Sequence, residues 1–511
     1  MAAKVLMVQG TASNVGKSVL VAGLCRLFKN HGIKVAPFKS QNMANNSYVT
    51  EKGEEIGRAQ ATQAFASGIQ PTVEMNPILL KPTTDKKCQL VVMGKVIESL
   101  TALEYHSYKK KLSPQIFNAL EHLRDCYDLI VIEGAGSPAE INLKKNEIVN
   151  MFVAKKISAP VILAGDIDKG GVFAQLIGTC QLLDSDEKKC IRAFLINKFR
   201  GDKKLLLPGL KWIEKRTKKK ILGVIPYIHN LSIDEEDSVV LEDGFGTFSK
   251  NGKSTKNKLL VHVIKLPRIS NFTDFDPLKK EKSVSLNYIE HPPRNILPDL
   301  LIIPGTKSTI SDLKFLKSQG FMDYILRCQK SKVPILGICG GYQMLGEKIF
   351  DPYSVESKQK ESDGLKIIPS ITVFERKKTT AQVKAVHLES NLKVEGYEIH
   401  MGCTQGRNGQ KPFFKITERY GMPIEDYDGT ILCSNEKENN SLIMGTYIHG
   451  LFDAPEFRSY FLNQIRKEVG LKSIKDENSE GEETTGFDQL AKIIEENIDK
   501  KLLMSLIEKQ K

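Results

Sequence analysis

The feature of this sequence that most limits its fold is a repeated alternation of short, fully apolar runs with helical patterns. The runs KVLMVQG, YDLIVIEG, APVILAGD and IRAFLINK are bounded by Gly, Pro or Asp and fall in the first half of the chain. A strand that is apolar on both faces needs a sheet that is covered on both faces, as parallel sheets with helical crossovers are. We therefore predict an α/β fold with a doubly wound parallel sheet in the N-terminal part.

A second series of apolar runs follows a polar, Gly-rich stretch, EEDSVVLEDGFGTFSKNGKSTKN. The runs KLLVHVIKL, PDLLIIPG, VPILGICGG and SLIMGTYIHG predict the strands of another α/β unit. A chain of 511 residues has room for two large domains. We predict a domain over residues 1–234, a linker over 235–257, a second domain over 258–465, and a C-terminal loop and helix over 466–511. An apolar stripe in that helix should pack on the body, and it comprises Leu490, Ile493, Ile494 and Ile498.

Composition excludes several classes of protein. Hydrophobic residues at 41% and charged residues at 26% are ordinary for a globular chain, so disorder is not expected. The formal net charge is +13, but the basic residues are scattered. This pattern favours a solvated basic surface that attracts a polyanionic small substrate over a nucleic-acid interface.

The cysteines and the N-terminus indicate the compartment. Nine cysteines form no C-x-x-C pair and no cluster with zinc-ligand spacing, and their odd number argues against a disulfide framework. MAAKVLMVQG has none of the regions of a signal peptide, and no apolar run reaches the ~18 residues of a membrane span. We expect a cytoplasmic protein with no membrane or nucleic-acid partner, and the sequence assigns no oligomeric state.

The segment GTASNVGKS lies between an apolar run and a helical pattern, as a phosphate-binding loop does. Backbone N–H groups and the helix N-terminus can surround phosphate oxygens, while Lys17 reaches the β- and γ-phosphates and Ser18 holds Mg²⁺. The spacing Gly10-x5-Gly16-Lys17-Ser18 is one residue longer than the usual motif. It resembles the loop of dethiobiotin synthetase and its relatives, which also has a residue like Thr11 after the first glycine. We predict ATP at this loop; the alternative is a Gly-rich turn without nucleotide.

Two acidic residues stand where predicted strands end, Glu133 in LIVIEGAGS and Asp166 in VILAGDIDKGG. Open α/β sheets bind ligands beyond these strand ends, and Mg²⁺ takes oxygen ligands from one or two carboxylates plus phosphates. We predict Glu133 as a Mg²⁺ ligand beside Ser18 and Asp166 as a second candidate, for which a helix cap is the alternative role. Four polar residues after the second predicted strand are candidates for the substrate or nucleotide site: Lys39, Gln41, Asn42 and Asn46.

The segment VPILGICGGYQMLG carries the second candidate site. Its G-x-C-x-G arrangement between a strand and a helix is the cysteine counterpart of the nucleophile elbow. A cysteine at a helix N-terminus is favoured as thiolate, so Cys339 is the predicted nucleophile. The alternative, a buried structural cysteine, is our interpretation of the other eight.

A thiolate nucleophile needs a base that takes and returns protons. His449, in IMGTYIHGLFD, follows another apolar run and is the first candidate, while His400 in GYEIHMG is the second; either could be a structural histidine instead. The oxyanion needs backbone donors, one from Gly340 after the nucleophile and a second from Gly305 or Thr306 in LLIIPGTKS.

Several segments in order resemble the cobyric acid synthase family of glutamine-dependent amidotransferases over nearly the whole chain. They are QGTASNVGKS, FKSQNMANNSYVT, IEGAGSPAEINL, GDIDKGGVFAQL, INKFRGD, PGTKSTISDL, GICGGYQMLG, GYEIHMG and YIHGLFD. The resemblance implies an N-terminal ATP-dependent synthetase domain and a C-terminal domain like class I glutamine amidotransferases. It also implies amidation of the b, d, e and g carboxylates of adenosylcobyrinic acid a,c-diamide with glutamine and ATP, with Mg²⁺ and without a tightly bound prosthetic group. Cys339 matches the family's nucleophile and His449 its catalytic histidine.

One departure from the wider amidotransferase pattern concerns the acid of the triad. Most class I enzymes carry H-x-E, whereas the residue two positions after His449 is Leu451. The pair therefore resembles a Cys–His dyad, with Glu398 only a possible third member. Two other functions stay open at this point: a cobyrinic acid a,c-diamide synthase, and a P-loop partitioning or scaffold ATPase that makes no product.

Overall fold

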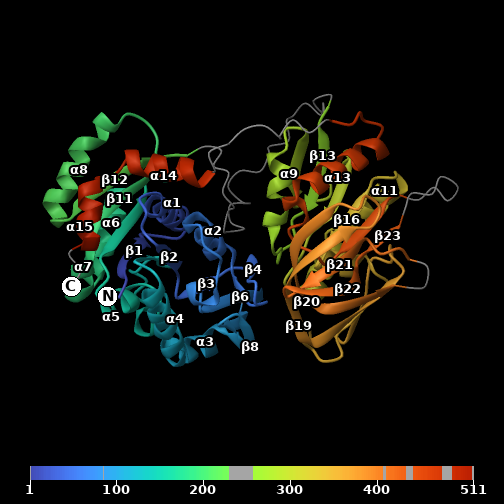
Figure 1. The fold of residues 1–511 in the computed structure, drawn as a ribbon, viewed down its shortest axis with the longest axis horizontal. Coiled ribbons are helices and arrows are strands. Elements are labelled where there is room, and N and C mark those ends of the chain that lie inside the picture. Colours follow the sequence, from blue (N-terminus) through green and yellow to red (C-terminus); the bar gives the residue numbers. More distant parts are fainter. Residues whose placement is uncertain are drawn as a thin grey trace. The chain divides into compact units, whose positions relative to one another are not determined.

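The structure is a computed structural model, and it divides the chain into two compact units (Figure 1). The first unit comprises Met1–Ala44, Ile56–Glu236 and Glu482–Lys511, and the second comprises Asn45–Glu55 and Asp237–Gly481. The described residues are 2–84, 86–228, 257–406, 410–432, 441–474 and 486–508. The predicted linker, except Asn257, lies outside the described residues. The predicted boundaries placed residues 45–55 in the N-terminal domain, whereas the structure gives them to the second unit.

A parallel sheet of six strands forms the centre of the first unit. Its strands are β1 (Lys4–Gly10), β2 (Val35–Phe38), β9 (Leu129–Glu133), β10 (Val161–Asp166), β11 (Ile191–Phe199) and β12 (Lys220–Pro226). Their order is β12-β11-β10-β1-β9-β2, and Met7 of β1 pairs with both Val161 and Ile132. Alternate residues of β1 enter different cores, Met7 one and Val8 the other. The doubly wound parallel sheet predicted from the apolar runs is therefore confirmed.

Helices cover both faces of this sheet (Figure 1). The helices of the unit are α1 (Lys17–Asn30), α2 (Arg58–Ser67), α3 (Ala102–Tyr108), α4 (Ser113–Cys126), α5 (Met151–Lys156), α6 (Val172–Leu182), α7 (Ser185–Cys190), α8 (Lys203–Thr217), α14 (Gly486–Glu496) and α15 (Lys500–Glu508), with 3-10 turns η1 (Val73–Met75), η2 (Lys109–Leu112) and η3 (Lys144–Asn146). The core of one face contains residues of α1, α14 and α15, and the core of the other contains residues of α4, α5 and α6. Gly23 of α1 lets α14 approach, because a β-carbon there would lie 2.3 Å from Ile494 Cδ1. The apolar stripe of the C-terminal helix thus packs on the first unit.

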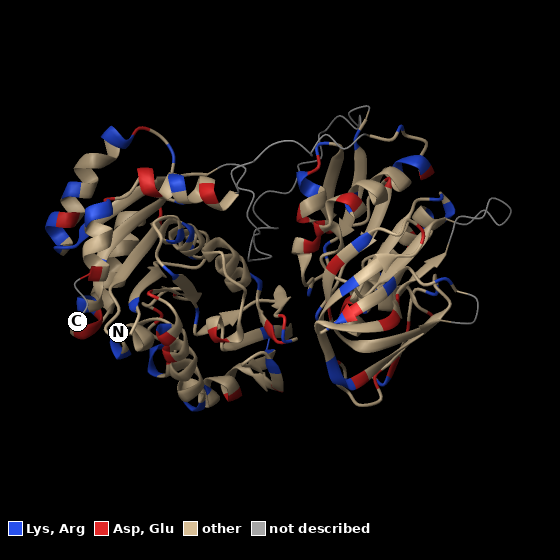
Figure 2. Cartoon of the chain, in the orientation of Figure 1, with Lys and Arg blue, Asp and Glu red and all other residues tan. Residues whose placement is uncertain are grey.

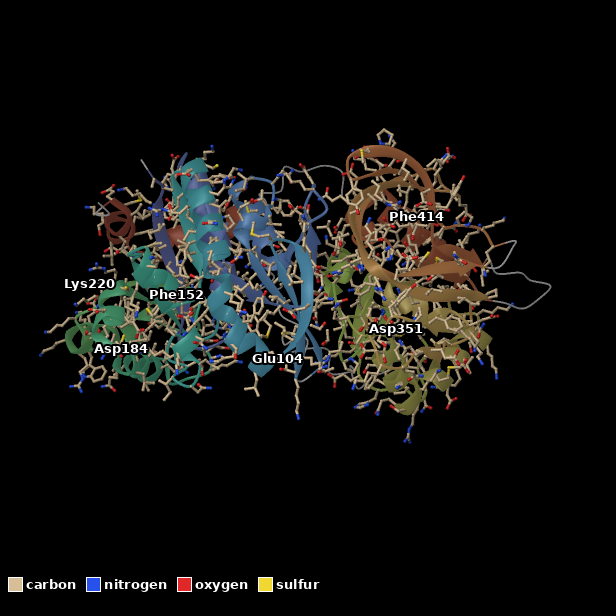
Figure 3. The ribbon with its side chains drawn as sticks, turned by 90° about the horizontal axis from the view of Figure 1, so that it is seen from below. Glu104, Phe152, Asp184, Lys220, Asp351 and Phe414 are labelled. Atoms are coloured by element: carbon tan, nitrogen blue, oxygen red, sulfur yellow. The ribbon has the colours of Figure 1, made fainter. Side chains whose placement is uncertain are left out.

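A smaller sheet in the order β3-β6-β7-β8 completes the first unit. Its strands are β3 (Gln41–Met43), β6 (Ile78–Thr84), β7 (Lys87–Val92) and β8 (Lys95–Thr101). At the end of β8, Glu104 and Thr101 form a capping box that starts α3 (Figure 3). After β2, the chain therefore forms strand β3 of this smaller sheet before it enters the second unit at Asn45.

The second unit is built around another mainly parallel sheet. Its strands are β13 (Leu259–Ile264), β14 (Val284–Ile289), β15 (Leu300–Ile303), β16 (Ile335–Ile338), β23 (Thr430–Leu432) and β24 (Ile443–Thr446). Their order is β14-β13-β15-β16-β24-β23, and only β23 runs antiparallel to its neighbour. Its helices are η5 (Phe272–Phe275), α9 (Asp276–Lys280), α10 (Thr309–Ser318), α11 (Phe321–Lys330), α12 (Gly340–Leu345), η6 (Leu451–Asp453) and α13 (Pro455–Glu468). All four predicted apolar runs become strands of this sheet.

A second, largely antiparallel sheet in this unit was not anticipated from the sequence. Its strands are β17 (Lys348–Phe350), β18 (Glu361–Asp363), β19 (Ser370–His387), β20 (Lys393–Gly406), β21 (Phe414–Arg419) and β22 (Met422–Asp428). A short pair, β4 (Ser47–Val49) and β5 (Glu55–Gly57), forms a sheet of two strands. Exposed and buried residues mix along β19 and β20, so these strands lack the continuous apolar runs of the central sheets. Phe414 anchors β21 in the core, with ring centroids 4.5 Å from Phe413 and 5.4 Å from Phe457 (Figure 3).

Charged residues are spread over both units. Basic and acidic side chains are interspersed along the helices and strands in Figure 2. This distribution agrees with the interpretation of the net positive charge as a solvated surface. The eight described cysteines are all free, and Cys433 lies outside the described residues.

Candidate active sites

The Cys339 turn has the geometry of a nucleophile elbow. Cys339 joins β16 to α12 with φ 50° and ψ −108°, a conformation that non-glycine residues seldom adopt. Its neighbours must be small, because a β-carbon at Gly341 would lie 1.9 Å from the Ile303 carbonyl oxygen. The Cys339 N–H donates to the Thr446 carbonyl of β24 at 2.8 Å. The strained turn places the thiol at the carboxyl end of the sheet, as the G-x-C-x-G pattern predicts.

His449 follows the neighbouring strand β24 and is fully buried. Its Nδ1 lies 2.6 Å from Asp274 Oδ2, and the Gly450 N–H donates to the other oxygen of the same carboxylate at 3.0 Å. The ring also stacks on Tyr397, with centroids 5.3 Å apart. Nδ1 is thereby committed to Asp274, which leaves Nε2 for proton exchange; Nε2 has no hydrogen-bond partner among the described residues.

The charge of this site favours a protonated imidazole. Burial by itself lowers the pKa of His449, but the charge and hydrogen bond of Asp274, together with Cys339, raise this pKa to about 10. The imidazole therefore carries a proton at neutral pH, as a general acid that protonates a leaving amine must. The Cys339 thiol donates a weak hydrogen bond to the Ile399 carbonyl, with Sγ 3.8 Å from the oxygen.

Asp274 is a residue that sequence reasoning missed. It lies in η5, far before His449 in the chain, and the H-x-E pattern gives no hint of it. A signal was present, since the polar segment RISNFTDFD follows the apolar run that becomes β13, and parallel strands carry functional residues at these ends. Tertiary structure alone brings this carboxylate to the histidine.

The alternative candidates Glu398 and His400 lie in a different network. Glu398 accepts from Arg419 Nε at 2.8 Å, and its nearest oxygen is 3.8 Å from His400 Nε2. The other ring nitrogen of His400 lies 2.7 Å from the Gly402 carbonyl oxygen, and the ring stacks on Tyr447 with centroids 4.0 Å apart. The carboxylate that orients His449 is therefore Asp274 and not Glu398.

The three residues predicted to line the oxyanion site come together around the elbow. A β-carbon at Gly340 would lie 3.2 Å from the Thr306 backbone nitrogen, and one at Gly305 would lie 3.0 Å from His449 Cε1. The Thr306 hydroxyl bonds Asp312 at 2.5 Å and so holds the turn. The Gly340 turn thus lies against the Thr306 backbone, and Gly305 lies against the histidine ring.

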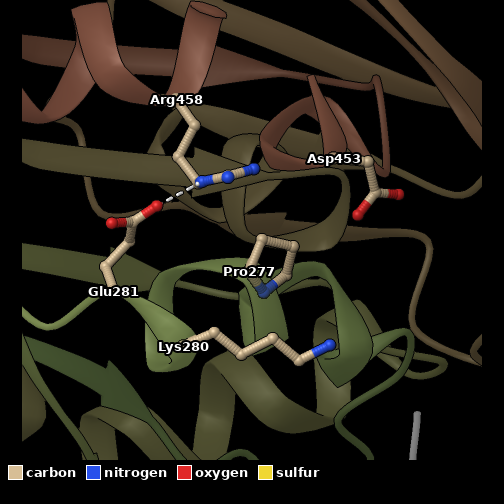
Figure 4. A pocket seen from close by; sticks show the side chains of 5 residues that line it. All are labelled: Pro277, Lys280, Glu281, Asp453 and Arg458. Carbon is tan, nitrogen blue, oxygen red and sulfur yellow. Dashed lines mark hydrogen bonds and ion pairs between the residues drawn. The ribbon is translucent and has the colours of Figure 1, made fainter. Parts of the chain in front are cut away.

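Arg458 ties together the segments that follow His449 and Asp274. Its Nε donates to Glu281 Oε1 at 2.7 Å and its Nη1 donates to the Phe452 carbonyl at 2.7 Å. Around this pair lies a pocket of about 240 Å³ (Figure 4). The lining residues are Pro277, Lys280, Glu281, Asp453 and Arg458. Because Arg458 is paired with Glu281, we interpret these pocket residues as structural residues that stabilise the histidine site and not as a ligand site.

In the first unit, the predicted phosphate loop joins β1 to α1. Gly16 has φ +91°, and a β-carbon there would lie 2.4 Å from Asn197 Nδ2, so only glycine fits. Lys17 Nζ donates to the Ala12 and Gly136 carbonyls at 3.0 and 3.2 Å, and therefore lies over the loop. A β-carbon at Gly10 would lie 2.5 Å from Val15 Cγ2, so this end of the loop is closely packed too.

The predicted Mg²⁺ ligands lie side by side. Ser18 Oγ donates to Glu133 Oε1 at 3.0 Å, and Glu133, which is 1% exposed, also accepts from Lys39 at 2.8 Å and Gln63 at 2.5 Å. A hydroxyl and a carboxylate at a phosphate loop are the hard oxygen donors that Mg²⁺ takes alongside phosphates. Among the described ranges, no group of three or more His, Cys, Asp or Glu could hold a metal ion. The donor set fits a nucleotide-bound Mg²⁺.

Asp166 reaches the loop only through another side chain. It pairs with Lys198 Nζ at 2.9 Å, and Lys198 also donates to the Asn14 carbonyl at 2.6 Å. Its other oxygen accepts from the Asp168 N–H at 2.9 Å, which is a turn-capping role. Thr11 meanwhile donates to Gln175 at 3.0 Å.

The four polar candidates after β2 do not form one group. Lys39 pairs with Glu133, Gln41 accepts from Tyr105 Oη at 2.5 Å, and Asn42 donates to Gln60 at 3.0 Å. Asn46 belongs to the second unit, where its side-chain oxygen accepts from the Phe272 N–H at 3.3 Å.

None of the helices within the described residues has the length and apolar character required to cross a membrane.

Comparisons with known proteins agree with this two-part organisation. Residues 6–240 match the family model of the CobQ/CobB/MinD/ParA nucleotide binding domain, and residues 260–457 match that of the CobB/CobQ-like glutamine amidotransferase domain. The chain is 48% identical to a cobyric acid synthase of Clostridium acetobutylicum and 48% identical to one of Clostridium tetani, in each case over 98% of both chains. It is 47% identical to a cobyric acid synthase of Dehalococcoides mccartyi, over 99% of both chains.

Proposed function

The chain belongs to the cobyric acid synthase family of glutamine-dependent amidotransferases, and from this premise we propose what its two sites do. We propose that it amidates the b, d, e and g carboxylates of adenosylcobyrinic acid a,c-diamide, with glutamine as ammonia donor and ATP as energy source. The observation that carries the proposal is the buried Asp274–His449 pair beside the Cys339 elbow, because it gives the thiol a neighbouring acid–base group that a carboxylate orients.

The second unit releases ammonia from glutamine. The Cys339 thiolate attacks the amide carbon of glutamine, and the Gly340 and Thr306 amides hold the resulting oxyanion. His449 gives its Nε2 proton to the departing ammonia while Asp274 keeps Nδ1 protonated. Water then attacks the thioester and returns a proton to His449. The C–S bond breaks, the thiolate is restored, and glutamate leaves with the release of the second water proton to solvent. Asp274 acts as the third member of a triad in this scheme.

The first unit activates the carboxylate. The loop between Gly10 and Ser18 binds the phosphates of ATP, with Lys17 at the transferred group. Ser18 and Glu133 would hold Mg²⁺, which neutralises phosphate charge when bound. The substrate carboxylate attacks the γ-phosphorus and ADP leaves, so that an acyl phosphate forms. Ammonia then attacks the acyl carbon, phosphate leaves, and the amide remains. A carboxylate needs this step because its own oxygen is a poor leaving group.

Replacement of the nucleophile tests the division of labour. Cys339→Ala should abolish synthesis from glutamine and leave synthesis from added ammonium salts, with product followed by mass spectrometry. Four added amides are expected, whereas two would indicate a cobyrinic acid a,c-diamide synthase. Loss of both activities in a folded variant would contradict separate sites. Absence of glutamate release by the wild type, with substrate and ATP present, would favour a P-loop ATPase without synthesis.

The cytoplasmic location expected from the cysteines remains a prediction. Asp166, Lys39, Gln41, Asn42 and Asn46 also remain predictions as ligand-binding residues.

A further inference from the structure

A short segment of the N-terminal chain is built into the glutaminase unit. Asn45–Glu55 comes between two parts of the first unit but belongs to the second. It runs out along β4, turns at Thr50, whose N–H donates to the Glu54 carbonyl at 2.8 Å, and returns toward β5. The proposed catalytic scheme gives this segment no role.

The segment holds the turn that carries Asp274 through two reciprocal hydrogen bonds. The Ser47 N–H donates to Asn271 Oδ1 at 3.0 Å, and the Phe272 N–H donates to Asn46 Oδ1 at 3.3 Å. Asn271 is buried, has φ +53°, and accepts from the Asp274 N–H at its own carbonyl, at 3.0 Å. We name these two bonds the asparagine clasp. It fixes the side chain of Asn271 and the amide of Phe272, which is the first residue of η5.

The same segment packs against the strand that borders His449 and Cys339. The rings of Tyr48 and Tyr397 lie 6.2 Å apart between centroids, and Tyr397 is the residue that stacks on His449. Val49 forms a small apolar cluster with Tyr397 and Ile399, and the Ile399 carbonyl accepts from the Cys339 thiol. One segment therefore adjoins the immediate neighbours of all three triad members.

Buried polar contacts hold the segment itself in place. Gln382 of β19 donates to Tyr48 Oη and to the Val49 carbonyl, both at 2.9 Å. Glu55, whose side chain is 1% exposed, pairs with Lys378 and accepts from Ser47 Oγ at 2.8 Å. Removal of one partner from such a pair leaves a buried charge unpaired, so the segment is bound firmly to the second unit.

We infer that Asn45–Glu55 is a positioning element of the glutaminase, and that Asn46 sets the place of Asp274 through the asparagine clasp. Asn46 bonds the turn and not a reacting atom, so it is a positioning residue. The inference rests on the proposed function, since it assumes that Asp274 orients His449. A small displacement of a catalytic group is costly, with about a hundredfold loss for ~1 Å.

A double-mutant cycle tests the inference in the full-length chain. Asn46→Ala removes the acceptor of the Phe272 N–H, and we expect glutaminase kcat to fall about tenfold, with the KM for glutamine nearly unchanged. In an Asp274→Asn background the same change should cost less than about twofold, because the group that it positions is already lost. Lys52→Ala, at the exposed turn of the same segment, is the matched control and should match the wild type.

The outcomes separate the inference from the proposed function. Equal losses in the two backgrounds, or no loss in Asn46→Ala, would overturn the positioning role while wild-type glutaminase stands. A wild type that releases no glutamate would overturn the proposed function itself. If Asn46→Ala does not fold, Asn46→Ser, whose shorter side chain should not reach the Phe272 amide, is subject to the same expectations. The pH profile gives a second readout, since a displaced Asp274 should move the alkaline limb of kcat to lower pH.

Discussion

Asp274→Asn is the sharpest test of the triad, because the substitution keeps shape and removes charge. In the wild type the two carboxylate oxygens serve different donors, His449 Nδ1 at 2.6 Å and the Gly450 N–H at 3.0 Å. An asparagine offers only one acceptor. If that acceptor serves Gly450, the amide group faces Nδ1 and forces the ring proton to Nε2, where it cannot accept the thiol proton. If the acceptor serves His449 instead, the asparagine NH2 group faces the Gly450 N–H, and two donors then oppose each other.

The expected loss follows from these contacts. A hydrogen bond to a charged group contributes about 1.5–3 kcal/mol, which corresponds to roughly a 10- to 150-fold change in rate. A wrong histidine tautomer raises the loss to as much as ~10⁴-fold in a comparable triad. Because Asp274 is 4% exposed and His449 is fully buried, water cannot replace the lost partner. We therefore expect glutaminase kcat to fall between about 10²- and 10⁴-fold.

The assay compares glutamate release with synthesis from ammonium salts, which should be retained. Asp323→Asn, on the exposed side of α11, is the matched control.

The pH dependence of the stability has a definite sign. Asp274 raises the pKa of His449 to about 10, so the stabilisation by the pair is full below the unfolded value near 6.5 and is lost as pH rises through about 10. The difference in stability between the variant and the wild type should be largest below pH 6.5 and should shrink as pH rises through about 10. A variant with wild-type kcat and pH profile would refute the assignment of Asp274.

Two further predictions concern the other residues singled out above. Lys17→Met should lower synthesis from ammonium salts by at least about a hundredfold, since Lys17 lies over the phosphate loop. Glutaminase activity should stay near that of the wild type, and an equal loss of both activities would contradict separate sites. Glu398→Gln should lower the melting temperature, because Arg419 loses a buried partner, but should leave the glutaminase pH profile unchanged. A shifted alkaline limb in that variant would assign Glu398 to the histidine after all.

Much of the fold could be predicted because it depends on local pattern. The runs that became β1, β9, β13, β15, β16 and β24 are apolar on both faces, and such strands have few arrangements other than a covered parallel sheet. The antiparallel strands β19 and β20 were not predicted, because exposed and buried residues mix along them and give no continuous apolar run. Membership of Asn45–Glu55 in the second unit was equally hidden, since no composition shift marks its ends.

The sequence by itself determined the catalytic and phosphate-binding residues whose roles depend on their immediate neighbours in the chain. A turn of a few residues defines each of them: Cys339 stands between small residues, and Lys17 and Ser18 follow Gly16. Spacing alone therefore identifies them. Only the tertiary structure decided which carboxylate orients His449. Asp274 reaches it from 175 positions away, because separate parallel strands end at one edge of the sheet and their following turns meet there. A pairing of that kind leaves no local trace in the chain.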